Sequence, residues 1–360
     1  MKVAVLGGGH GCYAAAADLS EQGHEVRLWR RDRAALEPVL RDKAITLVDQ
    51  HGRRAVPIAL VTGEIGDAVR GADLLFVPGP AFAQCDIARA AGPFLHDGQV
   101  VFLAPGSLGS IAMARTLREG GVRAQVRFAE TGTLPWLCRK HGPAEVAITM
   151  RATRLPTGVF PARHRDSAIA VIRAIWPSVE PIEDALSGAL MNAGPIIHPP
   201  LILMNAGPLE HSRNYDIHNE GTQPAVRRVT DRLDAERIAL RVALGYGPEH
   251  FPLSDHYNND RWMYGDSHQR LVESGDWREP IDLLSHRYMR EDVEYGLALL
   301  VSIARKFAIE SPIASGLLAI AGAICSSDFL QTSPRTLVRL GLAALDEQRL
   351  RALLHDGWSA

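Results

Sequence analysis

One histidine lies in the most apolar stretch of the sequence. The segment MNAGPIIHPPLILMNAGP (191–208) has a single ionisable side chain, His198, and two prolines follow it directly. Imidazole exchanges a proton near neutral pH, so a histidine here could act as a general acid or base. A lone histidine in apolar surroundings is nevertheless more often a core residue than a catalyst, and composition alone favours the core interpretation.

A second candidate for chemistry is the glycine-rich stretch GGGHGC at residues 7–12. Gly7 would allow a tight turn, Gly9 would let a pyrophosphate approach the backbone, and a following helix would offer free N–H groups to the anion. Cys12 stands where the G-x-G-x-x-G/A pattern usually has glycine or alanine. The alternative is a tight turn in another kind of α/β protein. The positions expected to contact a dinucleotide are Gly7, Gly9, His10, Gly11 and Cys12.

The elements around this loop are those of a dinucleotide-binding fold. KVAVLG (2–7) predicts a buried strand, the alanine-rich segment after it predicts a helix, and HEVRLW (24–29) predicts a second strand. A strand, glycine turn, helix and strand within roughly 30 residues form a βαβ unit.

Three further predicted strands end in turn residues: ADLLFVPGP (72–80), GQVVFLAPGS (98–107) and QVRFAETGTLPW (125–136). Ordinary turn chemistry would explain any one of these ends. Their recurrence favours the ligand-binding edge of a parallel sheet, and Pro78 on that edge is expected to contact the cofactor.

The end of the second predicted strand bears on the choice of cofactor. An NAD site usually has Asp or Glu there, which binds the ribose 2′-hydroxyl. The sequence LWRRD has Arg30 and Arg31 at this point and Asp32 after them. Two guanidinium groups suit a 2′-phosphate, so NADP(H) is favoured and NAD(H) is possible. The alternative is that both arginines are solvated and that Asp32 or no residue binds the ribose.

Composition indicates a globular protein. The chain has 360 residues, 46% hydrophobic and 22% charged, with a net charge of -2. This charge predicts neither nucleic acid nor an anionic membrane as a partner. The four cysteines are widely spaced, so we expect no metal site, no disulfide framework and a cytoplasmic location. No signal-peptide pattern is visible, and the prolines around His198 argue against a membrane-spanning helix.

From about residue 185 the pattern becomes helical. The segments concerned are DAERIALRVALGYG (234–247), EDVEYGLALLVSIARKFAI (291–309), PIASGLLAIAGAI (312–324) and the short amphipathic SPRTLVRLGL (333–342). The predicted architecture is an α/β Rossmann-type N-terminal domain (1–185) with a parallel-rich sheet, followed by an all-α C-terminal domain (186–360), with a ligand cleft between them.

Two charged positions in this helical half have both ordinary and functional interpretations. Asp292 follows Glu291 at the start of a predicted helix, where acidic residues favour the helix dipole. Arg287 lies just ahead of that helix and could be a surface residue. The separation of Asp292 from His198 in the sequence does not indicate whether the two side chains meet.

Five motifs in the same order give the chain a resemblance to the opine dehydrogenases, which include octopine and nopaline dehydrogenases and N-(carboxyethyl)norvaline dehydrogenase. The resemblance covers nearly the whole length. Its motifs are VLGGGHG, ETGTLPWLCR, IIHPPLILMNAG, the helical-domain pair EGTQPAVRRVTDRLDAERIAL and RYMREDVEYGL, and RTLVRLGL.

The resemblance implies reductive condensation of a 2-oxo acid, commonly pyruvate, with the amino group of an amino acid through an imine. It implies that His198 is the general acid/base and that Asp292 orients and charges it. It further implies that Arg287 binds the cofactor pyrophosphate, and it makes Thr133 and Asn192 candidates for contact with the substrate. A homodimer is expected, because the helical half is apolar and the family often pairs.

Two features depart from the family pattern. Cys12 replaces the usual small residue, and Arg30 stands where the norvaline-type enzyme has an acid. The segment 250–277 matches no known amino-acid specificity, and it could either contact the amino-acid substrate or form a surface crossover. Its notable side chains are His250, His256, Trp262, Tyr264 and His268.

Two other functions are open. A 2-hydroxyacid or polyol-phosphate dehydrogenase on the same plan would turn over without an amine, although the helical half has no lysine-centred catalytic motif of that kind. A non-catalytic NADP(H)-binding sensor would bind the cofactor tightly without turnover.

Overall fold

The computed structural model describes residues 1–358 apart from 213, 267 and 277–279. The chain forms two compact units: Met1–Ala189 together with the segment from Leu353 onward, and Leu190–Ala352. The predicted division at 185/186 differs from this at the C-terminal end. There, Trp358 packs edge-on against Phe160 of the first unit, with ring centroids 5.3 Å apart.

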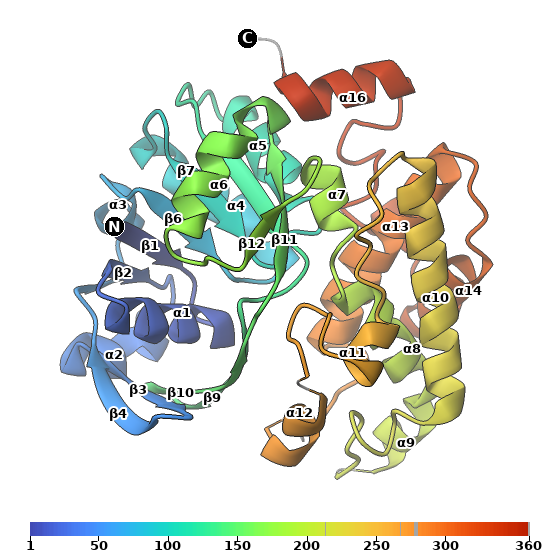
Figure 1. Cartoon of the computed structure of the whole chain (residues 1–360), viewed down its shortest axis with the longest axis horizontal. Coiled ribbons are helices and arrows are strands. Elements are labelled where there is room, and N and C mark those ends of the chain that lie inside the picture. The colour runs from blue at the N-terminus through green and yellow to red at the C-terminus, as the bar shows by residue number, and fades with distance from the viewer. Residues whose placement is uncertain (213, 267, 277–279, 359–360) are drawn as a thin grey trace. The chain divides into compact units, whose positions relative to one another are not determined.

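The first unit is built on one sheet of eight strands in the order β12-β11-β8-β7-β6-β1-β2-β5 (Figure 1). Neighbouring strands are parallel except β8 and β11, which are antiparallel, so the predicted parallel-rich sheet is confirmed. The strands are β1 (Lys2–Leu6), β2 (Glu25–Trp29), β5 (Leu60–Thr62), β6 (Leu74–Val77), β7 (Val100–Leu103), β8 (Arg127–Thr131), β11 (Leu155–Phe160) and β12 (Val179–Pro181).

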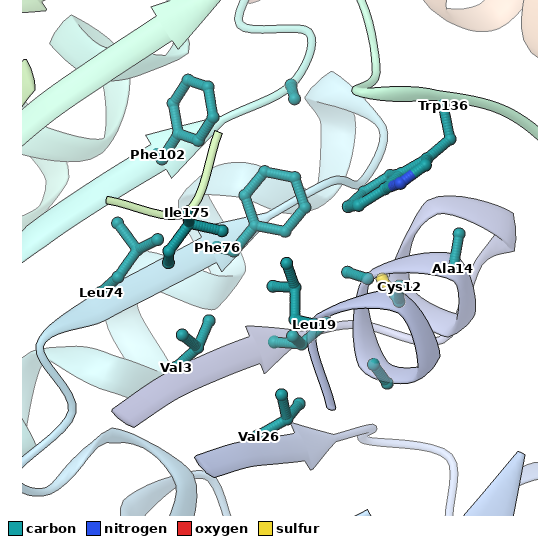
Figure 2. Packing of buried hydrophobic residues seen from close by; sticks show 14 of the residues in the cluster. Val3, Cys12, Ala14, Leu19, Val26, Leu74, Phe76, Phe102, Trp136 and Ile175 are labelled. Atoms are coloured by element: carbon teal, nitrogen blue, oxygen red, sulfur yellow. The ribbon is translucent and has the colours of Figure 1, made fainter. Parts of the chain in front are cut away.

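An aromatic cluster forms the centre of this unit's core. Figure 2 shows Phe76 of β6 between Phe102 of β7 and Trp136, with Leu19 and Cys12 of α1 on its other side. The ring centroids of Phe76 and Phe102 are 5.5 Å apart. The helical segments of the unit are α1 (His10–Glu21), η1 (Ala34–Leu36), α2 (Glu37–Asp42), α3 (Ile65–Val69), α4 (Ala81–Ala91), η2 (Gly92–Phe94), α5 (Gly109–Glu119), η3 (Ala162–His164), α6 (Arg165–Arg173) and α7 (Ala185–Ala189).

A second, four-stranded sheet packs against α1. Its order is β4-β3-β10-β9, and its strands are β3 (Ala44–Asp49), β4 (Gly52–Pro57), β9 (Trp136–Gly142) and β10 (Glu145–Arg151). Asp18 of α1 fixes this sheet, because its carboxylate accepts hydrogen bonds from Trp136 Nε1 at 2.9 Å and Arg151 Nη2 at 2.6 Å. The sheet therefore holds β9 beside the helix that follows the glycine loop.

All the regular secondary structure among the described residues of the second unit is helical. Its helices are α8 (Gly194–Met204), α9 (Ala206–His211), α10 (Pro224–Ala243), α11 (Ser254–Asn258), α12 (His268–Ser274), the π-helix η4 (Tyr288–Leu297), α13 (Ala298–Lys306), α14 (Pro312–Cys325) and α15 (Phe329–Thr332), and α16 (Glu347–Asp356) ends the chain's regular structure. Among the described residues, no helix has both the length and the apolar character needed to cross a bilayer.

Two segments differ from the predicted helices, and one helix was not predicted. The segment 291–309 is not one regular helix, because its first part is the π-helix η4. The segment 333–342 forms successive turns, in which Leu337 N donates to Ser302 Oγ at 2.9 Å, and the last helix is α16 instead. Helix α8 continues through Pro199 and Pro200, which cannot donate to the carbonyls four residues earlier.

Candidate functional site

The glycine loop connects β1 to α1, and three of its glycines have different structural roles. Gly7 has a φ of 135°, a conformation that L side chains rarely adopt. A Cβ at Gly9 would meet no atom within 4 Å, so the space beside the first turn of α1 is open. A Cβ at Gly11 would lie 3.0 Å from Pro78 Cβ, so Gly11 allows the loop after β6 to pack closely on α1. This cradle fits a dinucleotide pyrophosphate at the helix N-terminus.

Cys12 and His10 complete the loop. The Cys12 thiol contacts the carbonyl oxygens of Leu6 at 3.9 Å and Pro78 at 4.0 Å, and burial raises its pKa to about 12. Cys12 is therefore a neutral packing residue here, which explains why it can replace glycine or alanine. His10 Nδ1 accepts a hydrogen bond from Lys140 N at 2.8 Å, so its ring holds β9 against the start of α1.

The two arginines after β2 have different surroundings. The Arg30 side chain lies across Gly8, where a Cβ would overlap Arg30 Cδ, and Arg30 Nη1 donates to Ala35 O at 3.2 Å. The Arg31 side chain is 78% exposed and approaches Asp86 at 3.7 Å. Asp32 Oδ1 accepts from Ala35 N at 3.0 Å, which uses one of its oxygens to cap the local turn. Of the three, Arg30 is the side chain that lies directly against the loop.

His198 and Asp292 meet within the helical unit. His198 Nδ1 lies 2.7 Å from Asp292 Oδ2, with side chains 14% and 6% exposed. Helix α8 carries the histidine and the π-helix η4 carries the aspartate. The two residues are 94 positions apart in the sequence, so only the packing of these two helices brings them together.

Two glycines permit this packing. A Cβ at Gly296 of η4 would overlap Pro195 Cγ of α8. A Cβ at Gly194, the first residue of α8, would overlap Asp292 Oδ1. Glycine at each position therefore lets the helices approach until the carboxylate reaches the imidazole. Asn192 supports the start of α8, because its Oδ1 accepts a hydrogen bond from Gly194 N at 3.0 Å.

A π-helix is rare and is often associated with functional sites. Tyr288 and Asp292 of η4 both approach the same imidazole. They are four residues apart, a spacing that also places two side chains on one face of an ordinary helix.

Tyr288 and His218 surround the pair. The Tyr288 ring stacks on His198 with centroids 3.7 Å apart and planes 13° from parallel. A hydrogen bond of 2.8 Å joins Tyr288 Oη to His218 Nε2. Sequence reasoning missed both residues, although Tyr288 lies in the RYMRED motif, which could have drawn attention to it.

The electrostatics of the pair favour proton exchange near neutral pH. Burial raises the pKa of Asp292 to about 7, and the positive charges of Arg287 and His286 oppose this rise. A buried carboxyl and an imidazole at 2.7 Å titrate as a unit, so the pair can hold or release one proton close to physiological pH. This is the behaviour expected of a general acid/base.

The other predicted site residues are distributed over the two units. Thr133 lies in the loop after β8 of the first unit. Arg287 occupies the N-cap position of η4 in the second unit without a side-chain capping hydrogen bond, and its guanidinium lies 4.9 Å from the Tyr288 ring centroid. The segment 250–277 is not merely a surface crossover in its described part, since His256, Trp262 and Tyr264 are buried and burial lowers the pKa of His256 to about 3.

The first unit is of Rossmann type and has an open glycine cradle, and the helical unit carries a buried histidine–aspartate pair. Together they have the architecture of a two-domain, nucleotide-dependent dehydrogenase. Residues 181–325 match the family model described as the α-helical domain of NAD/NADP octopine/nopaline dehydrogenase. An opine dehydrogenase of Arthrobacter sp. (strain 1C) is 28% identical over 97% of this chain and 97% of its own length.

Solved structures agree on the fold. An octopine dehydrogenase in complex with NADH and agmatine superposes with a TM-score of 0.74 at 17% identity, covering 99% of this chain and 98% of that one. A yersinopine dehydrogenase with NADP+ bound gives a TM-score of 0.66 at 16% identity, covering 99% of this chain and 98% of that one. The resemblance to the opine dehydrogenases along the whole chain is thus confirmed, and residues 181–325 match the model of that family's helical domain.

Proposed function

We propose that this protein is an NAD(P)H-dependent opine-type dehydrogenase. It would condense a 2-oxo acid, such as pyruvate, with the amino group of an amino acid and reduce the resulting imine. The observation that carries the proposal is the buried contact of 2.7 Å between His198 Nδ1 and Asp292 Oδ2. The similarity to the Arthrobacter opine dehydrogenase along 97% of the chain supports it.

The pair supplies the proton transfers that this condensation needs. Asp292 fixes the Nδ1–H tautomer of His198, which directs Nε2 toward the substrate. Nε2 would accept a proton from the substrate ammonium, so that the amine nitrogen can attack the ketone carbon. The attacking nitrogen would pass one of its protons to the ketone oxygen to give a carbinolamine, and Nε2 would then donate its proton to that hydroxyl, so that water leaves and the protonated imine forms. Bound NAD(P)H supplies the hydride that reduces the imine carbon.

The chain's other candidates have binding roles in this proposal. Gly7, Gly9 and Gly11 shape the backbone around the pyrophosphate, with support from His10, Cys12 and Pro78. Arg30 and Arg31 favour NADP(H) over NAD(H), because each can pair with a 2′-phosphate. Thr133 and Asn192 would contact the substrate, and Arg287 would bind the cofactor pyrophosphate from the helical unit.

A matrix of 2-oxo acids against amino acids, followed by the oxidation of NADPH and NADH, tests the function. The proposal predicts oxidation only when both an acid and an amine are present, with a secondary amine dicarboxylate as the product. Oxidation with a ketone alone would instead indicate a simple 2-hydroxyacid or polyol-phosphate dehydrogenase. Tight cofactor binding without turnover across the matrix would indicate a sensor protein.

His198→Ala provides the test of the residue. We expect turnover to be lost while the affinity for the cofactor is retained, since the glycine loop, Arg30 and Arg287, which would bind the cofactor, keep their side chains. Unchanged turnover would remove His198 from the chemistry. We also propose a homodimer, which light scattering of the purified protein would establish.

A further inference from the structure

Lys140 is a half-buried cation that the proposed function has not used. It lies on β9, its backbone N–H donates to His10 Nδ1 at 2.8 Å, and its ammonium nitrogen lies 3.5 Å from the centre of the Tyr13 ring. No carboxylate in the described part of the chain pairs with it. A charge removed from water without an opposite charge is costly, so its position needs a reason.

Tyr13 adds an unsatisfied hydroxyl at the same place. The residue is fully buried in the first turn of α1, and its hydroxyl makes no well-formed hydrogen bond among the described residues, although the Arg30 guanidinium is close enough to interact with it. Buried tyrosine hydroxyls usually find a partner. The hydroxyl therefore has capacity for a further hydrogen bond, which a ligand oxygen beside Arg30 would supply.

Arg30 adds a second positive charge beside Lys140 and Tyr13. Its side chain lies on Gly8, and the ion pair that it makes among the described residues is a long contact of 3.8 Å with the largely exposed Asp32. Burial first, and then the charge of Arg30, lower the pKa of Lys140 to about 8. Two cations and an unsatisfied hydroxyl, all beside the glycine loop, form a site that attracts an anion.

We propose that Lys140, together with the hydroxyl of Tyr13 and the guanidinium of Arg30, binds the 2′-phosphate of NADP(H). This inference rests on the proposed use of a nicotinamide dinucleotide, and it adds a specificity residue from a strand far from the glycine loop in the sequence. The 2′-phosphate is favoured over the pyrophosphate because Arg30 directly follows β2, where Rossmann-type domains bind the adenosine ribose. The pyrophosphate belongs at the open backbone of Gly9.

A pH dependence of binding follows. The charged or titratable groups near Lys140 are Arg30 from the loop after β2 and His10, Cys12 and Tyr13 from α1. Cys12 is neutral because its pKa is raised to about 12. Since a phosphate dianion favours the charged ammonium, binding near pH 8 should be accompanied by uptake of about half a proton by Lys140.

The experiment compares adenosine 2′,5′-bisphosphate with 5′-AMP by titration calorimetry of the full chain, at pH 8 in buffers of different ionisation enthalpy. We expect Lys140→Met to weaken the bisphosphate about 10- to 100-fold, leave 5′-AMP within about twofold, and abolish the proton uptake. Arg53→Met is the control, because it removes an exposed cation from β4 of the same sheet. Its affinities should match those of the unmodified protein.

Tyr13→Phe separates binding from folding. The hydroxyl makes no well-formed hydrogen bond within the described chain, so thermal stability should change little, whereas affinity for the bisphosphate should drop about three- to tenfold. Equal weakening of both nucleotides by Lys140→Met would assign Lys140 to another phosphate and overturn the inference. Unchanged bisphosphate affinity in Lys140→Met would overturn it as well. Opine formation with NADH by a protein that binds the bisphosphate no better than 5′-AMP would overturn it while leaving the proposed function intact.

Discussion

The substitution Asp292→Asn tests the proposed acid/base pair most directly. Asparagine has nearly the shape of aspartate but no charge, so helix packing around Gly194 should persist while the partner of His198 becomes neutral. The amide can also turn its NH₂ group toward Nδ1, which would favour the wrong imidazole tautomer.

The size of the effect follows from the geometry. The contact of 2.7 Å between the closest atoms corresponds to charge centres about 4 Å apart, where the attraction is about 4 kcal/mol at an effective permittivity of about 20. Burial raises the pKa of Asp292 to about 7, so the carboxylate is only partly ionised at neutral pH and the full value is an upper limit. We therefore expect kcat/KM to fall by about 30- to 1000-fold at neutral pH, the equivalent of about 2–4 kcal/mol.

The assay is the oxidation of NADPH with a productive pair of 2-oxo acid and amino acid, measured from pH 5.5 to 9.5, together with the Kd for NADPH. Cofactor affinity should stay within about twofold, because the residues proposed to bind the cofactor, Arg287 included, keep their side chains. Glu294→Gln is the matched control, since it removes another carboxylate charge from η4 at a site paired with Arg290. A rate and a pH profile for Asp292→Asn like those of the control would refute the proposed pair.

Three further outcomes are expected. Gly194→Ala should lower kcat at least about tenfold without changing NADPH affinity, because the new Cβ overlaps Asp292 Oδ1, whereas Gly316→Ala, with no atom within 4 Å, should have no effect on steady-state rates. Tyr288→Phe keeps the stacking on His198 and loses only the hydrogen bond to His218, so its kcat should fall less than about fivefold, and that of Tyr288→Ala clearly more. Because the pKa of Asp292 is raised in the folded state, the ionised carboxylate opposes folding, and its contribution to the free energy of unfolding should fall as pH rises from about 4 to about 7. Chemical denaturation at several pH values, compared with Asp292→Asn, would detect this loss.

The first βαβ unit was predictable because its signals are local. The apolar run before Gly7, the glycine turn and the alanine-rich helix are contiguous, and their order is enough to indicate a dinucleotide-binding fold. The resemblance of five motifs extended that prediction to the helical half.

The small sheet and the anion site on it were not predictable in this way. Strands β3 and β4 lie in residues 44–57, and β9 and β10 lie in residues 136–151. The pairing of β3 with β10 is therefore long-range and has no local signal in the sequence. Lys140 reaches Tyr13 only through that pairing. A lysine in the stretch LCRKHG has no feature in the sequence that distinguishes it from an ordinary surface residue.

The apolar segment around His198 has a physical explanation that combines local and long-range effects. Pro195 packs against Gly296, and Gly194 packs against Asp292, so two close approaches fix α8 on η4 within one turn of the histidine. Apolar neighbours keep this region dry, which strengthens the interaction between the imidazole and the carboxylate. All these contacts lie inside the helical unit, so its own packing fixes the geometry of the pair. In the proposed function, the first unit would determine which dinucleotide binds and the second would carry the proton transfers.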